Sequence, residues 1–166
     1  MNIAVQLEPS TGSPPAVEYR WDTDTDILTA RLRAPGDGAG PSGSLEIEAP
    51  DGAWLILDVV KGRIAGVEVA VWPEVHVRPS LMPPVVGSGA QVAMPMGPGE
   101  TGAMIMEMET ALQAESDDAE RVIHFRIGLR RDVHAVRLGR DLLLELDAQS
   151  RIAGLWLLNV PPLPST

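Results

Sequence analysis

Cysteine is absent from this 166-residue chain. Disulfides, thiolate zinc sites and cysteine nucleophiles are therefore excluded. Aromatic side chains are also few, with four Trp, one Tyr and one Phe, although hydrophobic residues make up 45% of the sequence. That hydrophobic content is too high for a disordered chain. The core must therefore consist mainly of Val, Leu, Ile, Ala and Met.

Long apolar runs are missing as well, since no stretch approaches the roughly 18 residues that a membrane span needs. The first residues, MNIAVQLEPS, carry no basic region of the kind that begins a secretory signal. We therefore expect a cytoplasmic protein without a membrane partner. The net charge of −10 repels phosphate backbones, so no nucleic-acid partner is expected either. Lys61 is the only lysine beside many arginines, which is typical of a GC-rich bacterial genome.

An internal repeat is present. The tetrapeptide RIAG occurs at Arg63–Gly66 and again at Arg151–Gly154, followed each time by an apolar run. Upstream, residues 17–32 align without a gap on residues 123–138. This pattern predicts a duplicated chain. We divide it into a first β repeat at 1–72, a Pro/Gly/Met-rich connector at 73–102 and a second β repeat at 103–166.

Strand signals dominate both repeats. Polar and apolar residues alternate in SLEIEA and MIMEMET, and Asp51-Gly52 and Lys61-Gly62 mark turns between such runs. Residues 109–121 suit either a short helix or a polar loop. We predict an all-β fold of about ten antiparallel strands. A small sheet with one apolar face must cover it, so the two repeats are expected to pack with pseudo-twofold symmetry as a β-sandwich or flattened barrel.

The segment WDTDTDI at 21–27 carries three acids at alternate positions, Asp22, Asp24 and Asp26. Placing Tyr19 opposite Leu28 puts both apolar faces on one side and predicts a hairpin loop at 22–25. Aspartate suits such a loop because its carboxylate accepts backbone N–H groups. The alternative is a weak calcium site at the three acids, although the glycine and final glutamate of a calcium loop are missing.

The pattern YRWDTDTDILTARL followed by SLEIEAPDGAWLILDVVKGRIAGVEV resembles a family of small bacterial proteins, domain-of-unknown-function family twenty-two eighty-three. The resemblance covers about residues 17–72 and, more weakly, 123–158. It implies a small antiparallel β unit and no established activity. The matching residues are Tyr19, Asp22, Asp26, Leu28 and Leu32 in one block, and Asp58, Gly62, Ile64, Gly66, Val67 and Glu68 in the other.

Few residues suggest catalysis. The histidines are His76, His124 and His134, and no G-x-S-x-G or H-E-x-x-H motif accompanies them. Side-chain alternation predicts His134 on the core face, where the first repeat has Leu28, and His124 on the outer face beside Arg126. We therefore expect no cofactor, no metal and no catalytic residue.

The connector is uncharged but apolar between residues 79 and 99, unlike a flexible linker. We expect it to pack on its own protein or on a second subunit. The leading hypothesis is a non-catalytic interaction or self-assembly module whose partner is another protein or a second copy. A small-molecule binder or hydrolase is the alternative, using Asp22, Asp26, His134 and Glu68 in a cleft between the repeats. The candidate interaction residues are Met82, Val85, Val86, Met94 and Met96.

Overall fold

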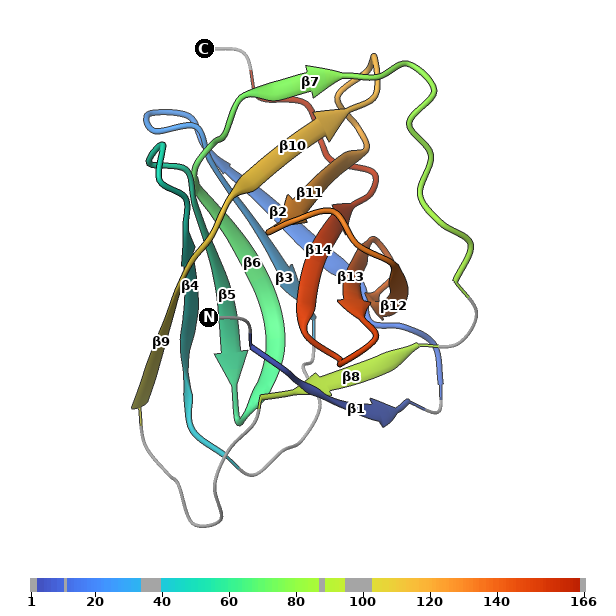
Figure 1. Ribbon diagram of the computed structural model, residues 1–166. Coiled ribbons are helices and arrows are strands. Elements are labelled where there is room, and N and C mark those ends of the chain that lie inside the picture. Colours follow the sequence, from blue (N-terminus) through green and yellow to red (C-terminus); the bar gives the residue numbers. More distant parts are fainter. Residues whose placement is uncertain (1–2, 11, 34–39, 87–88, 95–102, 165–166) are drawn as a thin grey trace.

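The computed structural model describes residues 3–10, 12–33, 40–86, 89–94 and 103–164. These residues form fourteen strands and no helix, so the predicted all-β class is confirmed, with more strands than the ten expected (Figure 1). The strands lie in two sheets of eight and six strands. Among the described residues, no helix is long and apolar enough to cross a membrane.

The first sheet contains five antiparallel strands that we call the first half, in the order β2-β3-β6-β5-β4. Their bounds are β2 (Val17–Asp22), β3 (Ile27–Leu32), β4 (Ser42–Glu48), β5 (Trp54–Val60) and β6 (Arg63–Val71). Three further strands extend this sheet, namely β1 (Gln6–Pro9), β8 (Ala90–Ala93) and β9 (Ala103–Glu109). β9 pairs parallel with β4, while β8 joins β1 to the start of β6.

The second sheet contains five antiparallel strands in the corresponding order, β10-β11-β14-β13-β12, which we call the second half. Their bounds are β10 (Leu112–Ser116), β11 (Ile123–Ile127), β12 (Val133–Gly139), β13 (Leu142–Asp147) and β14 (Ile152–Leu157). β7 (Val75–Val77) pairs parallel with β10 at the edge. In both halves the first two strands form a hairpin and the fifth strand lies between the second and the fourth.

Both copies of RIAG adopt the same irregularity. Ile64 faces Val59 and Gly66 faces Asp58, so Ala65 is an extra residue on β6. Ala153 is the extra residue on β14 in the same way. A β-bulge of this kind bends its strand and changes the direction of nearby side chains. The repeated tetrapeptide therefore marks an equivalent point in the two sheets.

The strand pairing differs from the sequence alignment of the two repeats. That alignment equates residues 17–32 with residues 123–138, which would make β11 and β12 a hairpin. In the structure β11 pairs with β10 and β14, and β12 pairs with β13 at the edge. By position in the sheet, β2 and β3 correspond to β10 and β11 instead.

The hairpin register and the expectation for residues 109–121 also need correction. Tyr19 pairs with Ala30 and Trp21 with Leu28, so the loop is residues 23–26, not 22–25. The predicted faces are preserved because the register shift is two residues. In place of a helix or loop, residues 112–116 form strand β10, whose alternate residues Leu112, Ala114 and Ser116 are buried.

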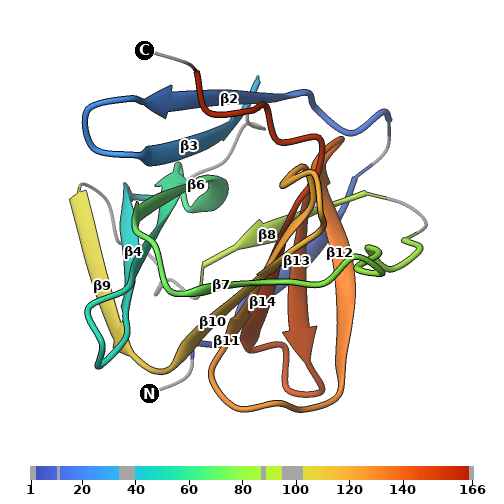
Figure 2. The same ribbon diagram turned by 90° about the horizontal axis from the view of Figure 1, so that it is seen from above.

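A single hydrophobic core lies between the sheets. Seen from above, the first sheet curls from β9 through β4 and β6 to β3 and β2, with the second sheet opposite (Figure 2). The Trp72 ring stacks on the Trp21 ring, with centroids 5.9 Å apart, and its centroid lies 5.8 Å from that of Phe125 in the second sheet. The single O–H of Tyr19 is shared between the carbonyls of Leu158 and Asp141, with O···O distances of 2.7 and 3.1 Å. Burial, followed by the charge of Asp141, raises the pKa of this hydroxyl.

Candidate functional site

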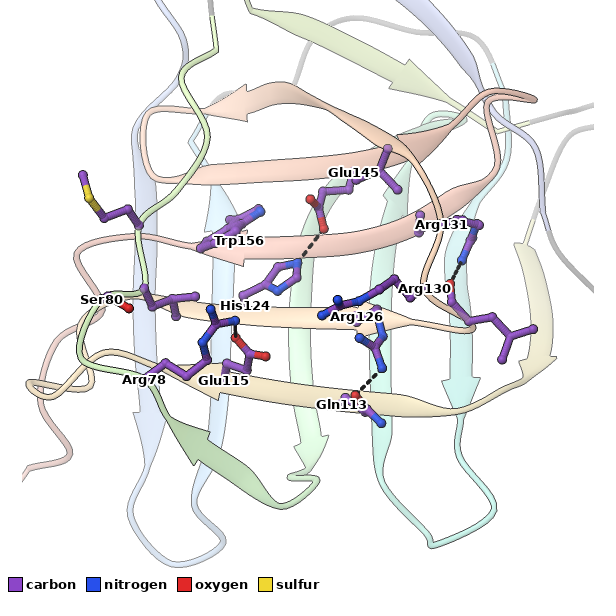
Figure 3. Close-up of a pocket in the computed structure, with 15 residues that line it drawn as sticks. Arg78, Ser80, Gln113, Glu115, His124, Arg126, Arg130, Arg131, Glu145 and Trp156 are labelled. Atoms are coloured by element: carbon purple, nitrogen blue, oxygen red, sulfur yellow. Dashed lines mark hydrogen bonds and ion pairs between the residues drawn. The ribbon is translucent and has the colours of Figure 1, made fainter.

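A pocket of about 360 Å³ lies on the outer face of the second half (Figure 3). Its floor is formed by side chains of β10, β11, β14 and β13. On β11, Ile123, Phe125 and Ile127 point into the core, which leaves His124 and Arg126 on the opposite face. The walls are residues 78–82, after β7, and residues 129–131, after β11.

His124 and Glu145 are joined at the centre of the floor. His124 Nε2 and Glu145 Oε1 are 2.5 Å apart. The imidazole also stacks on the Trp156 indole, with ring centroids 4.3 Å apart. His124 and Trp156 are direct cross-strand partners, which explains the stacking. The histidine ring is therefore held both by an aromatic neighbour and by a carboxylate.

Four arginines and two glutamates line the pocket. Their formal charges leave a local charge of +2 on a protein whose net charge is −10. Arg78 pairs with Glu115 at 2.7 Å. Arg126 donates to the neutral amide of Gln113, and no carboxylate of the described residues pairs with it. Arg130 is exposed and makes no hydrogen bond or ion pair within the described part of the chain.

Two N–H donors beside the pocket are unsatisfied. Nε of Arg126 and Nε1 of Trp156 are buried and have no acceptor among the described residues. Buried donors normally find an acceptor, because leaving one without a partner costs about 1–3 kcal/mol. These two donors are therefore left without a partner, although Glu115 and Glu145 line the same pocket.

The fourth arginine of the lining, Arg131, fixes one wall. Its guanidinium donates to Asp147 Oδ2 at 3.0 Å and to three backbone carbonyls, those of Ile127, Leu129 and Ile152. These bonds connect the turn that carries Leu129 and Arg130 to β14. The position of Arg130 at the pocket edge thus depends on Arg131 and, through it, on Asp147.

Asp147 is the most enclosed carboxylate of this network, with a side chain only 3% exposed. Burial by itself would raise its pKa. Hydrogen bonds from the Arg151 backbone, the Arg131 guanidinium, the Gln149 backbone and the Arg151 guanidinium outweigh burial and lower the pKa to about 2. Asp147 therefore stays ionised at every pH near neutrality.

None of the three loop aspartates lines this pocket. Asp22 ends β2, and its Oδ1 accepts the backbone N–H of Asp24 at 3.0 Å. Asp26 has a left-handed φ of 58°, which suits aspartate in a turn, and its carbonyl accepts the indole N–H of Trp72 at 2.8 Å. All three are exposed. Among the described residues, no group of three or more acids and histidines could hold a metal ion.

The four residues suggested for a cleft between the repeats are not brought together. Asp22 and Glu68 line an open hollow of about 650 Å³ on the outer face of β2 and β3, without Asp26 or His134. His134 shares the core side of β12 with Val136 but lies near the end of the strand and is exposed, so its predicted burial is wrong. A pocket of about 340 Å³ does lie where the two halves meet, and none of the four lines it.

The five connector candidates are also dispersed. Met82 is 79% exposed and lines the pocket, and Val85 is fully exposed. Val86 is half-buried, whereas Met94 is 2% exposed and packs in the core cluster. Met96 lies outside the described residues. Part of the connector therefore packs on its own protein, as expected, and part is left on the surface.

Side-chain alternation along residues 123–127 predicts His124 and Arg126 on one outer face, but nothing in the sequence identifies Glu145 and Trp156 as their neighbours. Only the order β13-β14-β11 brings these residues to one place. A signal for Glu145 was present, however. It is the single acid in the run LLLEL, and every residue of that run is buried. No family model matches the chain, and no curated protein matches it.

Proposed function

We propose that this protein binds a small organic anion, a carboxylate or a phosphate ester, in the pocket of the second half. The observation that carries the proposal is Arg126. It is a partly buried guanidinium with no carboxylate partner among the described residues and one buried N–H without an acceptor. An oxyanion in the pocket would give the part of this guanidinium that lines the pocket a charged partner, and charge-assisted hydrogen bonds of this type are the strong ones.

The remaining lining supports a ligand with an apolar body. The lining includes the apolar side chains of Leu81, Met82, Leu129 and Val133, while Arg126 and Arg130 supply the charge. The volume falls within the range of small-molecule sites, which begins at about 300 Å³. A local charge of +2 on an acidic protein also favours anions at this one place.

Binding rather than turnover is the proposed activity. His124 Nε2 is occupied by Glu145, and no hydroxyl of the described residues hydrogen-bonds to this histidine. Nucleophilic catalysis requires a base in contact with a nucleophile. In this pocket the His124 imidazole is fixed by Glu145 and Trp156 and contacts no nucleophile among the described residues.

The Arg126→Gln variant tests the proposal. Titrations of the wild type with benzoate and with phenyl phosphate, followed by calorimetry, should show saturable binding of at least one of the two. The variant should bind about tenfold or more weakly, because it loses a charged hydrogen-bond donor worth about 1.5–3 kcal/mol. The two ligands distinguish a carboxylate site from a phosphate site.

The matched control is Arg121→Gln, which removes the same charge from an exposed position outside the pocket lining. Its affinity should equal that of the wild type, and neutral benzamide should bind to neither protein. Failure of both anions to bind at millimolar concentration, or equal affinity in Arg126→Gln, would contradict the proposal.

Self-association is the second candidate, with a second copy of this chain as the partner. It is supported by the exposed side chains of Met82 and Val85 on one segment. If they form a contact, light scattering at micromolar concentration should report twice the chain mass of 17.7 kDa. Met82→Ser/Val85→Ser should then restore the monomer mass. A wild-type protein that stays at 17.7 kDa would dismiss this candidate.

We also propose that the two halves arose by duplication and that the protein acts in a bacterial cytoplasm. The shared strand order and the bulge at both RIAG sequences support the duplication. The composition, with its single lysine and abundant arginine, supports the bacterial origin.

A further inference from the structure

We propose that His124 raises the affinity of the pocket for anions, because it keeps Glu145 away from Arg126. This inference rests on the proposed function and concerns its regulation by one neighbouring side chain. It follows from a comparison of equivalent positions in the two halves.

In the first half, Arg31 and Asp58 are both cross-strand partners of Gly66, from opposite sides. Directly paired residues lie on the same face of a sheet. The two strands on either side of Gly66, β3 and β5, are about 9.6 Å apart. Because Gly66 has no side chain, nothing on this face separates Arg31 from Asp58. Arg31 Nε and Asp58 Oδ2 approach to 3.6 Å across it. The Arg31 guanidinium is therefore already paired with a carboxylate of the protein itself.

The second half has a matching set of residues in the same places. Arg126 and Glu145 are both partners of Gly154, from β11 and β13. A Cβ at Gly154 would collide with Glu145 Oε1, so the Glu145 side chain lies directly over this glycine. Glutamate is one methylene longer than Asp58, and its carboxylate already extends toward β11. The internal pair with Arg126 is therefore within reach.

Glu145 bonds to His124 instead, at 2.5 Å. His124 lies two residues before Arg126 on the same face of β11, and its ring is held by stacking on Trp156. The first half has Thr29 beside Glu68 at the corresponding pair of positions, with no imidazole. The histidine thus provides Glu145 with a partner and leaves Arg126 without a carboxylate.

Without the imidazole nitrogen, Glu145 would turn to Arg126, as Asp58 does to Arg31. The carboxylate would then occupy the guanidinium that the ligand anion needs. An anion would have to displace an internal ion pair, so the affinity would fall although every arginine of the pocket is still present.

The experiment uses His124→Phe, which retains a ring to stack on Trp156 but cannot bond to Glu145. Titration with benzoate and phenyl phosphate should show roughly tenfold weaker binding than in the wild type for whichever anion the wild type binds, equivalent to one broken charged contact. The double variant His124→Phe/Glu145→Gln should return the affinity to within about threefold of the wild type, because the competing charge is gone.

A structural measurement tests the inference without a ligand. In a crystal structure of His124→Phe, the Glu145 carboxylate should lie within about 4 Å of the Arg126 guanidinium, the usual limit of an ion pair. His124→Gln, which can still donate to Glu145, serves as the second variant if the phenylalanine variant does not fold. In that protein Glu145 should stay bonded to the side-chain amide of the introduced glutamine, and the affinity should remain near that of the wild type.

The outcomes separate this inference from the proposed function. Wild-type binding with unchanged affinity in His124→Phe, or a Glu145 carboxylate that stays away from Arg126 in that variant, overturns the role of His124 alone. Failure of the double variant to recover binding also overturns it. Absence of any binding to the wild type overturns the proposed function, while the crystal structure still decides which partner Glu145 takes.

Discussion

The Asp147→Asn variant is expected to lose about 3–5 kcal/mol of unfolding free energy, because removing one partner of a buried ion pair leaves an uncompensated charge. The carboxylate accepts the guanidinium N–H groups of Arg131 and Arg151 at 3.0 and 2.9 Å and the backbone N–H groups of Gln149 and Arg151 at 2.9 and 3.0 Å. Arg131 and Arg151 are the groups left behind, with side chains 21% and 36% exposed.

Urea unfolding of both proteins, followed by circular dichroism, measures this loss. Asp118→Asn is the matched control, because Asp118 is an exposed aspartate whose carboxylate forms no bond among the described residues. The control should change stability by less than about 0.5 kcal/mol. A loss of under about 1 kcal/mol in Asp147→Asn would show that the network contributes little to the fold.

Acidification is expected to remove about 2–3 kcal/mol of stability through the same carboxylate. Asp147 has a pKa of about 2 in the folded protein against an ordinary value of 3.8. The pKa is depressed by folding, so the stabilisation is complete above about pH 4 and is lost as the pH falls toward about 2. Asp58 acts in the opposite direction, since burial raises its pKa despite the neighbouring charge of Arg31.

Unfolding free energies measured between about pH 5 and pH 2 test this expectation, with Asp147→Asn as the reference. The difference between the two proteins removes the contribution of Asp58 and of the other acids that both share. That difference should shrink steadily below about pH 4. A difference that stays constant down to about pH 2 would mean that Asp147 titrates alike in the folded and unfolded chains.

The strands themselves could be predicted from the sequence, because alternation reports directly which face of a strand is buried. The hairpin at 17–32 shows the limit of this signal. A period of two fixes which residues share a face, but it is satisfied equally by registers that differ by two residues. Asp26 resolves the choice, since its left-handed backbone belongs inside the loop. That conformation is not visible in the pattern of apolar residues.

Strand order could not be predicted for a different reason. Residues 123–138 resemble the β2–β3 hairpin in composition, but the two strands they contain are separated in the sheet by β14 and β13. Pairing partners are chosen by the packing of the whole core, while an alignment compares only neighbours in the chain. The RIAG motif was informative because its bulge is a local structure.

The site was predictable only to the level of one strand. The alternation in IHFRI places His124 and Arg126 on one outer face, as the structure has them. Glu145 and Trp156 join them from β13 and β14, so their contribution depends on the strand order. The aspartates of WDTDTDI, which are more conspicuous in the sequence, serve the hairpin turn instead.

The parallel pairing of β9 with β4 has a consequence for how the chain matures on the ribosome. On one side, Ser42–Glu48 of β4 pair with residues 103–109 of β9, and 54 residues of the chain separate the two strands. At about 5–20 residues per second, β9 is synthesised roughly 3–11 seconds after β4. Throughout that interval β4 presents an open edge, which is the feature of nascent sheets most prone to mispairing. Glu46 and Glu48 lie on β4, and their negative charges would repel the same strand of a neighbouring nascent chain until β9 has paired.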